Sequence, residues 1–165
     1  MNREQFLAQR DYLNMVHAVT VRAIGAFADD ELGFQPRPEM RTPRQLIFHV
    51  YCQEKLSAEA AKSGRMTIEA LNRMNPEDAA AAAQLKGLVT VADLRAFADS
   101  SHQAAETIAR ALSEDEINRP VESPMGTFPA WRYFSFAYDE HWHHRGQLYT
   151  YLRLLGKEPP MLYDY

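Results

Sequence analysis

One glutamate and two histidines have the side chains and the spacing to bind a divalent cation. Glu140 and His144 are four residues apart in a segment with a helical pattern, so their side chains lie on the same helix face. His49 lies on the apolar stripe of another predicted helix and also points inward. Two neutral imidazoles and one carboxylate form a facial ligand set that leaves positions open for water or substrate. The sequence therefore predicts a divalent-metal site formed by His49, Glu140 and His144.

Each of these features has a simpler interpretation when it is taken alone. A single inward histidine is usually a hydrogen-bonded core residue, and a Glu–His pair four residues apart is more often plain polarity on a helix surface. Together the three residues are harder to explain in this way, because burying three ionisable groups without compensation costs several kcal/mol. His141 lies at the edge of the same inward face, whereas His143 points well away from it.

Other polar residues also have two interpretations. Gln147 either orients a ligand through a hydrogen bond or is simply a satisfied polar group. Cys52, the one cysteine of the chain, is either a nucleophile or, as is more usual, a small buried hydrophobe. His17 and His102 have no obvious partner, and we expect them at the surface or in helix packing. The residues alone do not identify a catalytic group.

Four segments with the apolar spacing of long amphipathic helices must position these side chains. Their start and stop signals are N-capping residues and terminal glycines or prolines. We predict helices over Glu4–Ala28 and over Pro43–Lys62, a third that starts at Thr90–Asp93 and carries buried residues to Leu112, and a last one over Pro129–Leu155.

The segments between these helices are predicted to be loops, with one short accessory helix. Residues 29–41 and 121–128 contain helix-breaking glycines and prolines and are expected to be loops. The alanines of Ala79–Ala83 favour a short helix, with an N-cap at Asn75–Glu77. We therefore predict an all-α protein whose residues 1–165 form a single domain, a four-helix bundle with a short accessory helix between the second and third long helices.

Two motifs resemble those of a known family. The run from His143 to Leu148, His-His-Arg-Gly-Gln-Leu, which leads to Tyr-Leu-Arg and Gly156, resembles the C-terminal signature of the DinB/YfiT-like metalloenzymes. Thr42-Pro43 leading to His49 is similar to the family's other anchor. The resemblance implies a four-helix bundle that binds a divalent metal, commonly nickel or zinc, through one histidine of the second helix and a His-x-x-x-His pair of the last helix.

The sequence departs from the family pattern at one ligand position. The alignment of the motif places His144 on the second histidine of the pair and Glu140 on the first. A carboxylate binds zinc, nickel or iron, so the site is expected to persist as two histidines and one glutamate. Two other outcomes are open at this point: His141 pairs with His144 in place of Glu140, or the site is weak or empty.

The resemblance also implies a function. DinB-like enzymes are thiol-dependent S-transferases or isomerases that use low-molecular-weight thiols such as bacillithiol or mycothiol. A metal with an open position lowers the pKa of a bound thiol and presents a thiolate to an electrophile. The alternative is a non-catalytic, stress-associated helical bundle with a weak or vestigial metal site. The sequence identifies neither the thiol nor the electrophile.

The composition narrows the possible partners and the location. Eighteen Lys and Arg against 22 Asp and Glu give a net charge of −4 without a basic block, which argues against nucleic acid as a partner. No stretch approaches the roughly 20 apolar residues that a membrane span needs. A single cysteine suits a reducing compartment, so we expect a cytoplasmic protein.

The last predicted helix has a second apolar face that indicates a homodimer. Phe134, Tyr138, Trp142 and Tyr149 lie away from the predicted metal site. The accessory segment, which is the spare cover within one chain, has small side chains. We therefore expect a symmetric pair in which the partner buries at least part of Trp142.

Overall fold

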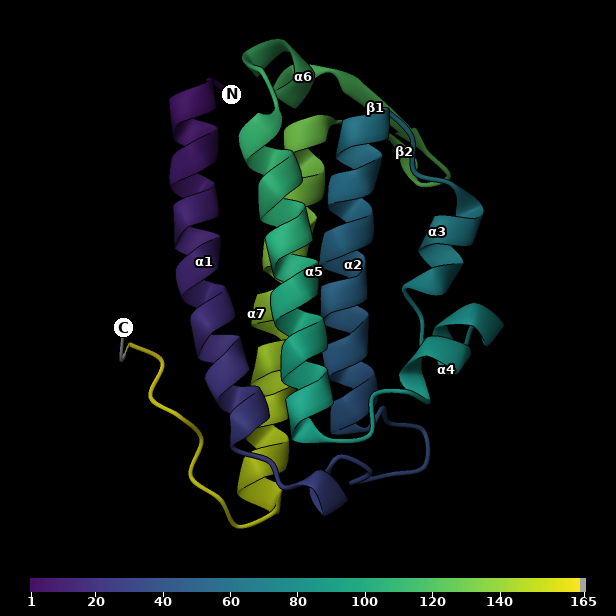
Figure 1. Cartoon of the computed structure of the whole chain (residues 1–165), viewed down its shortest axis with the longest axis vertical. Coiled ribbons are helices and arrows are strands. Elements are labelled where there is room, and N and C mark those ends of the chain that lie inside the picture. Colours follow the sequence, from purple (N-terminus) through teal and green to yellow (C-terminus); the bar gives the residue numbers. More distant parts are fainter. Residues whose placement is uncertain (164–165) are drawn as a thin grey trace.

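Four long helices run side by side in the computed structural model, which describes residues 1–163 (Figure 1). α2 packs against both α5 and α7, and α1 covers the other side of these two helices. The arrangement confirms the predicted all-α four-helix bundle. The long helices are α1 (Arg3–Gly25), α2 (Pro43–Ser63), α5 (Val91–Ala111) and α7 (Ala130–Leu154).

Both ends of α2, the helix that carries His49, are set by local sequence. The Thr42 hydroxyl accepts a hydrogen bond from the Gln45 N–H at 3.3 Å, and the Gln45 side chain accepts one from the Thr42 N–H at 2.8 Å. Gly64 ends the helix with a φ of 82°, a left-handed conformation that strains residues with a Cβ. This capping confirms the predicted start, and the helix extends one residue beyond the predicted end.

The connection between α2 and α5 contains two short helices where the sequence pattern indicated one. They are α3 (Ile68–Arg73) and α4 (Ala79–Leu85), and they lie along the outer side of α2 (Figure 1). The N-cap of α4 is Asp78, whose carboxylate accepts hydrogen bonds from two backbone N–H groups, rather than the predicted Asn75–Glu77. Two further short elements are η1 (Asp29–Glu31) and α6 (Glu114–Asn118).

The segment predicted as the loop 121–128 is a β-hairpin. β1 (Pro120–Ser123) pairs antiparallel with β2 (Gly126–Pro129), and Gly126 has a φ of 119° after the two-residue turn. The backbone of Glu122 bonds to Gly64 and Met66, which ties the hairpin to the end of α2. The hairpin is therefore attached to the C-terminal end of α2 and leads directly into α7.

Two apolar clusters occupy opposite ends of the bundle. Phe6, Phe48 and Phe134 belong to one cluster. Ile24 and Leu94 belong to the other, which also includes inward-facing residues near the C-terminal end of α7. Buried polar residues lie between them. Among residues 1–163, none of the helices combines the length and the hydropathy that a membrane crossing requires.

Candidate metal centre

The structure brings His49 from α2 together with Glu140 and His144 from α7. His49 Nε2 lies 3.2 Å from Glu140 Oε2, and His144 Nε2 lies 3.0 Å from the same oxygen. One nitrogen or oxygen atom from each residue lies within 4.8 Å of the others, and the two imidazole rings are perpendicular, at 89°. Within residues 1–163, this is the one cluster of three potential metal ligands.

Hydrogen bonds at the far side of each ring fix which nitrogen faces the carboxylate. The Met74 carbonyl lies 2.6 Å from His49 Nδ1, and Gln147 Oε1 lies 2.6 Å from His144 Nδ1. Both oxygens are acceptors, so both Nδ1 atoms carry the proton. In the neutral rings, the two Nε2 atoms therefore direct lone pairs toward the negatively charged oxygen of Glu140.

This convergence of lone pairs is a test of whether the residues fit a metal ion. The two Nε2 lone pairs and the carboxylate oxygen that they face repel one another, unless both rings are protonated or a cation lies between them. Two histidines and one carboxylate are a ligand set that proteins use for zinc and for other divalent transition metals. The donor set therefore fits a divalent cation.

The carboxyl group of Glu140 is ionised at neutral pH, as a metal ligand must be. Its pKa lies below the ordinary value, because hydrogen bonds donated by His144 and then His49, when their rings are protonated, stabilise the carboxylate, while partial burial opposes the shift. The side chain is 34% exposed, so the centre is open to solvent on one side.

A pocket of about 430 Å³ extends from the open side of this centre. His49 and Glu140 are among its lining residues, and the others come from α2, α3, the turn of the hairpin and α7. Its volume lies within the range of small-molecule binding sites. A bound cation would therefore be reached from a cavity of a size that admits a small organic molecule.

His141 lies in the core of the bundle, away from the centre. Its Nε2 is 3.1 Å from Glu54 Oε2, its Nδ1 is 3.3 Å from Thr20 Oγ1, and the side chain is fully buried. Of the two arrangements that the sequence left open, the structure brings Glu140, and not His141, to His49 and His144. His143 is exposed on the outer face of α7, as expected.

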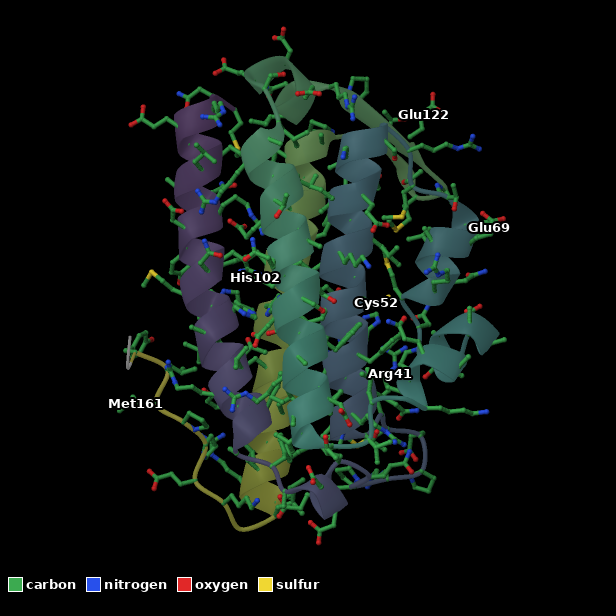
Figure 2. The ribbon with its side chains drawn as sticks, viewed as in Figure 1. Arg41, Cys52, Glu69, His102, Glu122 and Met161 are labelled. Atoms are coloured by element: carbon green, nitrogen blue, oxygen red, sulfur yellow. The ribbon has the colours of Figure 1, made fainter. Side chains whose placement is uncertain are left out.

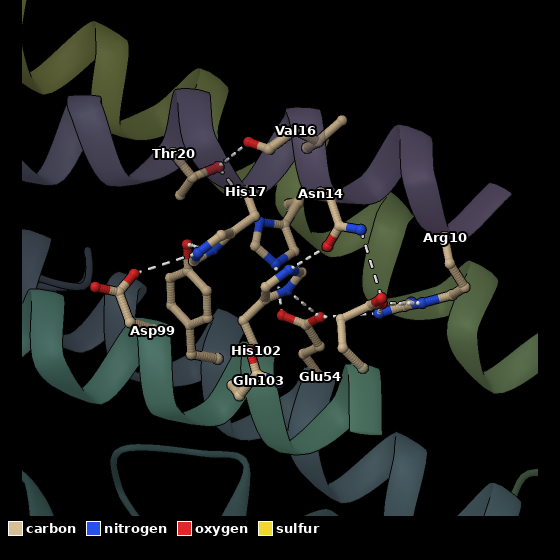
Figure 3. A network of polar contacts seen from close by, with 12 residues as sticks. Arg10, Asn14, Val16, His17, Thr20, Glu54, Asp99, His102 and Gln103 are labelled. Carbon is tan, nitrogen blue, oxygen red and sulfur yellow. Dashed lines mark hydrogen bonds and ion pairs between the residues drawn. The ribbon is translucent and has the colours of Figure 1, made fainter. Parts of the chain in front are cut away.

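Glu54 is the centre of a buried polar network that the sequence analysis missed (Figure 3). Its carboxylate lies 2.8 Å from His102 Nδ1, 3.1 Å from His141 Nε2 and 3.4 Å from a guanidinium nitrogen of Arg10. Arg10 also pairs with Glu106 on α5. Burial alone raises the pKa of Glu54, but the hydrogen bonds from His102 and His141 outweigh burial and hold it well below the ordinary value.

The sequence did contain a signal for this network. Four residues on the same helix face as Glu54 are apolar, namely Ile47, Tyr51, Ala58 and Ala61. A carboxylate on such a face needs a buried partner. We expected His102 at the surface or in helix packing. The structure places it in helix packing and not at the surface.

His17 lies at the edge of the network and is expected to make stability depend on pH. Its ring stacks on His102 at 3.9 Å and lies 3.0 Å from the Tyr51 hydroxyl. Burial, together with the nearby charge of His102, lowers the pKa of His17 to about 3, although Glu54 opposes this shift.

Because an unfolded histidine titrates near its ordinary value of 6.5, the unfolded state binds more protons than the folded state between pH 6.5 and pH 3. The free energy of unfolding is therefore expected to fall with decreasing pH in this window, by up to about 1.4 kcal/mol per pH unit. Urea unfolding at pH 7, 6 and 5 measures this slope. His17→Gln should flatten it, and the exposed His143→Gln should leave it unchanged. Equal slopes in the wild type and His17→Gln would contradict the assignment to His17.

The fold and the centre define a helical bundle whose groove carries a His–Glu–His cluster, and comparison with known proteins places the chain in a family. The profile of the DinB superfamily matches residues 12–148. The chain belongs to the DinB superfamily. No protein of curated function matches it.

Solved structures share this fold at low sequence identity. A DinB-like protein from Bacillus subtilis is 19% identical, with a TM-score of 0.68, and the match covers 90% of this chain and 96% of that one. A mycothiol-dependent maleylpyruvate isomerase is 22% identical, with a TM-score of 0.69 over 90% of this chain. This chain covers 61% of the isomerase, which is longer.

Proposed function

We propose that this protein is a metal-dependent enzyme that joins a low-molecular-weight thiol to an electrophile, or isomerises the electrophile through the thiol. His49, Glu140 and His144 would hold the metal, with nickel or zinc favoured and iron as a further option. The observation that carries the proposal is the pair of Nε2 atoms that face one carboxylate oxygen at 3.2 and 3.0 Å. The mycothiol-dependent isomerase with a similar fold supports the choice of a thiol as the co-substrate.

Each residue of the centre has a defined role in this proposal. A divalent cation bound there supplies Lewis-acid activation, which lowers the pKa of a thiol. Met74 and Gln147 orient the two rings through their Nδ1 atoms. Glu140 contributes a negative charge that offsets part of the charge of the cation. The pocket holds the electrophile, whose carbon forms a bond to sulfur while its leaving group departs with the electron pair.

The protein's own thiol is a poor candidate for the nucleophile. Cys52 lies on the side of α2 that faces α3 (Figure 2), and its Sγ is 3.2 Å from the carbonyl oxygen of Arg73. Burial raises the pKa of this thiol to about 11, so it stays protonated at neutral pH. A thiolate must therefore come from a small molecule. Since such thiols are kept reduced inside cells, we place the protein in the cytoplasm.

Metal analysis of protein purified without a polyhistidine tag tests the proposal. We expect one equivalent of metal per chain, and metal-dependent consumption of chlorodinitrobenzene in the presence of mycothiol or bacillithiol. Protein that stays folded, binds no metal after incubation with zinc or nickel, and consumes no thiol would instead support a non-catalytic bundle.

We also propose a homodimer, on a smaller surface than the sequence indicated. α1 and the C-terminal segment cover two of the four aromatic residues, since Phe134 packs against Phe6 and Tyr149 packs with Val19. The expectation that only the accessory segment was available to cover this face was therefore wrong. Three residues in the same region remain at least a third exposed, at 41%, 38% and 37%: Tyr12, Met15 and Trp142.

The dimer is expected to depend on Trp142. A glutamate at this position would place a charge in the apolar contact, and we expect Trp142→Glu to be monomeric. Light scattering of the wild type should give twice the chain mass of 18.9 kDa. Val89→Glu, which adds the same charge at another exposed apolar residue, is the matched control and should remain dimeric. A monomeric wild type, or a dimer unaffected by Trp142→Glu, would contradict this assembly.

A further inference from the structure

The carbonyl that orients His49 belongs to a short segment that does not hold itself in place. Met74 is the C-cap of α3, and its carbonyl oxygen lies 2.6 Å from His49 Nδ1. α3 has only six residues, and an isolated helix of this length is unstable in water. The Met74 side chain is buried, but apolar packing is non-directional and does not determine where the carbonyl points. Other contacts must therefore fix the orientation of this carbonyl.

One of these contacts comes from the thiol of Cys52. Cys52 follows His49 by three residues, so the two side chains are neighbours on one face of α2. Its S–H group donates a hydrogen bond to the carbonyl oxygen of Arg73, which lies 3.2 Å from Sγ. Burial raises the pKa of this thiol, so the proton that it donates stays bound at neutral pH. Since the carbonyls at the C-terminal end of a helix have no partner within it, α2 supplies donors to two consecutive carbonyls at the end of α3.

Arg41 holds the chain on the other side of the Met74 carbonyl. Its guanidinium donates to Asn75 Oδ1 at 3.2 Å and to the two oxygens of the Glu77 carboxylate at 3.3 and 3.1 Å. The Asn75 side chain donates in turn to the Leu71 carbonyl within α3, at 3.2 Å. A forked guanidinium fixes orientation as well as distance. Arg41 therefore attaches the residues that follow Met74 to the start of α2.

Arg41 is itself attached to α7, the helix that carries the other two predicted ligands. Its carbonyl oxygen accepts a hydrogen bond from the Tyr151 hydroxyl at 2.9 Å. Tyr151 follows His144 by seven residues, which is about two turns along one face of α7. Figure 2 shows Arg41 and Cys52 on the side of the bundle where α3 and α4 lie along α2. The Met74 carbonyl therefore lies between two attachments, one at Cys52 and one at Arg41.

We propose that Arg41 and Cys52 are positioning residues for the metal centre. They fix the backbone of residues 73–75, so that the Met74 carbonyl receives the Nδ1 proton of His49 and Nε2 points toward Glu140. Each acts through this carbonyl and not as a ligand. The inference rests on the proposed function, because it concerns the same centre. It gives the one cysteine of the chain a role as a hydrogen-bond donor instead of a nucleophile.

Nuclear magnetic resonance of metal-free protein with isotope-labelled histidine tests the positioning without a metal. The Nδ1 proton of His49 lies in a short hydrogen bond, and its exchange with water measures how firmly that bond is held. We expect Arg41→Met and Cys52→Ala each to speed this exchange about tenfold, the effect of losing roughly one hydrogen bond. The Nδ1 proton of His144, which bonds to Gln147, should keep its rate in both variants and is the internal control.

Conservative replacements separate hydrogen bonding from packing. Cys52→Ser retains a donor, and Arg41→Lys retains a positive charge opposite Glu77, so each should restore part of the protection that Cys52→Ala or Arg41→Met loses. Zinc affinity, measured by competition with a chromophoric chelator, should follow the same order, with a loss of about tenfold in the two disruptive variants. Arg37→Met, at an exposed arginine that also precedes α2, is the matched control and should leave both measurements unchanged.

Unchanged exchange of the His49 proton in both disruptive variants would overturn the proposal, and unchanged exchange in one of them would overturn it for that residue. An equal acceleration at His144 would show a general loosening of the bundle and would also overturn the assignment. If the wild type binds no zinc while the exchange rates change as expected, the enzymatic proposal fails and the positioning of His49 stands.

Discussion

Alanine in place of His49 or His144 is expected to abolish stoichiometric metal binding. Each substitution removes one of the three atoms that converge within 4.8 Å, and the two remaining ligands hold a divalent cation poorly. Loss of a residue that merely orients a ligand costs 10–100-fold in affinity, so loss of a ligand should cost at least about 100-fold. Elemental analysis and competition with a chromophoric chelator measure the change.

Two further variants determine whether the geometry is responsible. His143→Ala changes the exposed histidine next to His144 and should leave metal binding unchanged. Glu140→His creates the three-histidine set that the resemblance implies and should tighten binding. Equal losses in all three histidine variants would show that the metal is held elsewhere.

Glu54→Ala is expected to destabilise the fold by about 3–5 kcal/mol, the usual cost of removing one partner from a buried ion pair. The substitution leaves Arg10, His102 and His141 without the carboxylate that they share. It also leaves a cavity between the two apolar clusters. Urea unfolding at pH 7 measures the free energy of unfolding.

The matched control is Glu59→Ala, at an exposed position of the same helix. A surface substitution of this kind usually changes stability by no more than about 0.5 kcal/mol. If Glu54→Ala were as stable as Glu59→Ala, the buried network would contribute nothing to the folded state. Metal content measured on both variants separates a global loss of stability from a local effect on the centre.

Much of the bundle was predictable because its signals are local. The cap at Thr42 and Gln45 and the glycine at position 64 define α2 within a few residues of sequence. The centre was predictable for a related reason. Four-residue spacing aligned Glu140 with His144, and the apolar stripe turned His49 inward, so helical periodicity alone oriented all three side chains correctly.

The features that the sequence did not predict depend on residues far apart in the chain. The hairpin over 120–129 is short, and backbone hydrogen bonds to the end of α2 hold it in place. Arg10 finds Glu106 across 96 positions of sequence. Periodicity indicated that His141 was near the inward face, but only the positions of Thr20 and Glu54 on neighbouring helices decide where its ring lies.

Glu140 and His141 are adjacent in sequence but belong to two different polar centres. Consecutive residues of an α-helix are separated by about 100°, so α7 is held at two separate directions around its own axis. A rotation of about 10° would move a side-chain end at a radius of about 5–6 Å by about 1 Å. That displacement is several times the ±0.2 Å within which metal–ligand distances are held. The contact between His141 and Glu54 therefore restricts rotation of α7 about its axis, and the geometry of the proposed cation site depends on a residue that does not contact it.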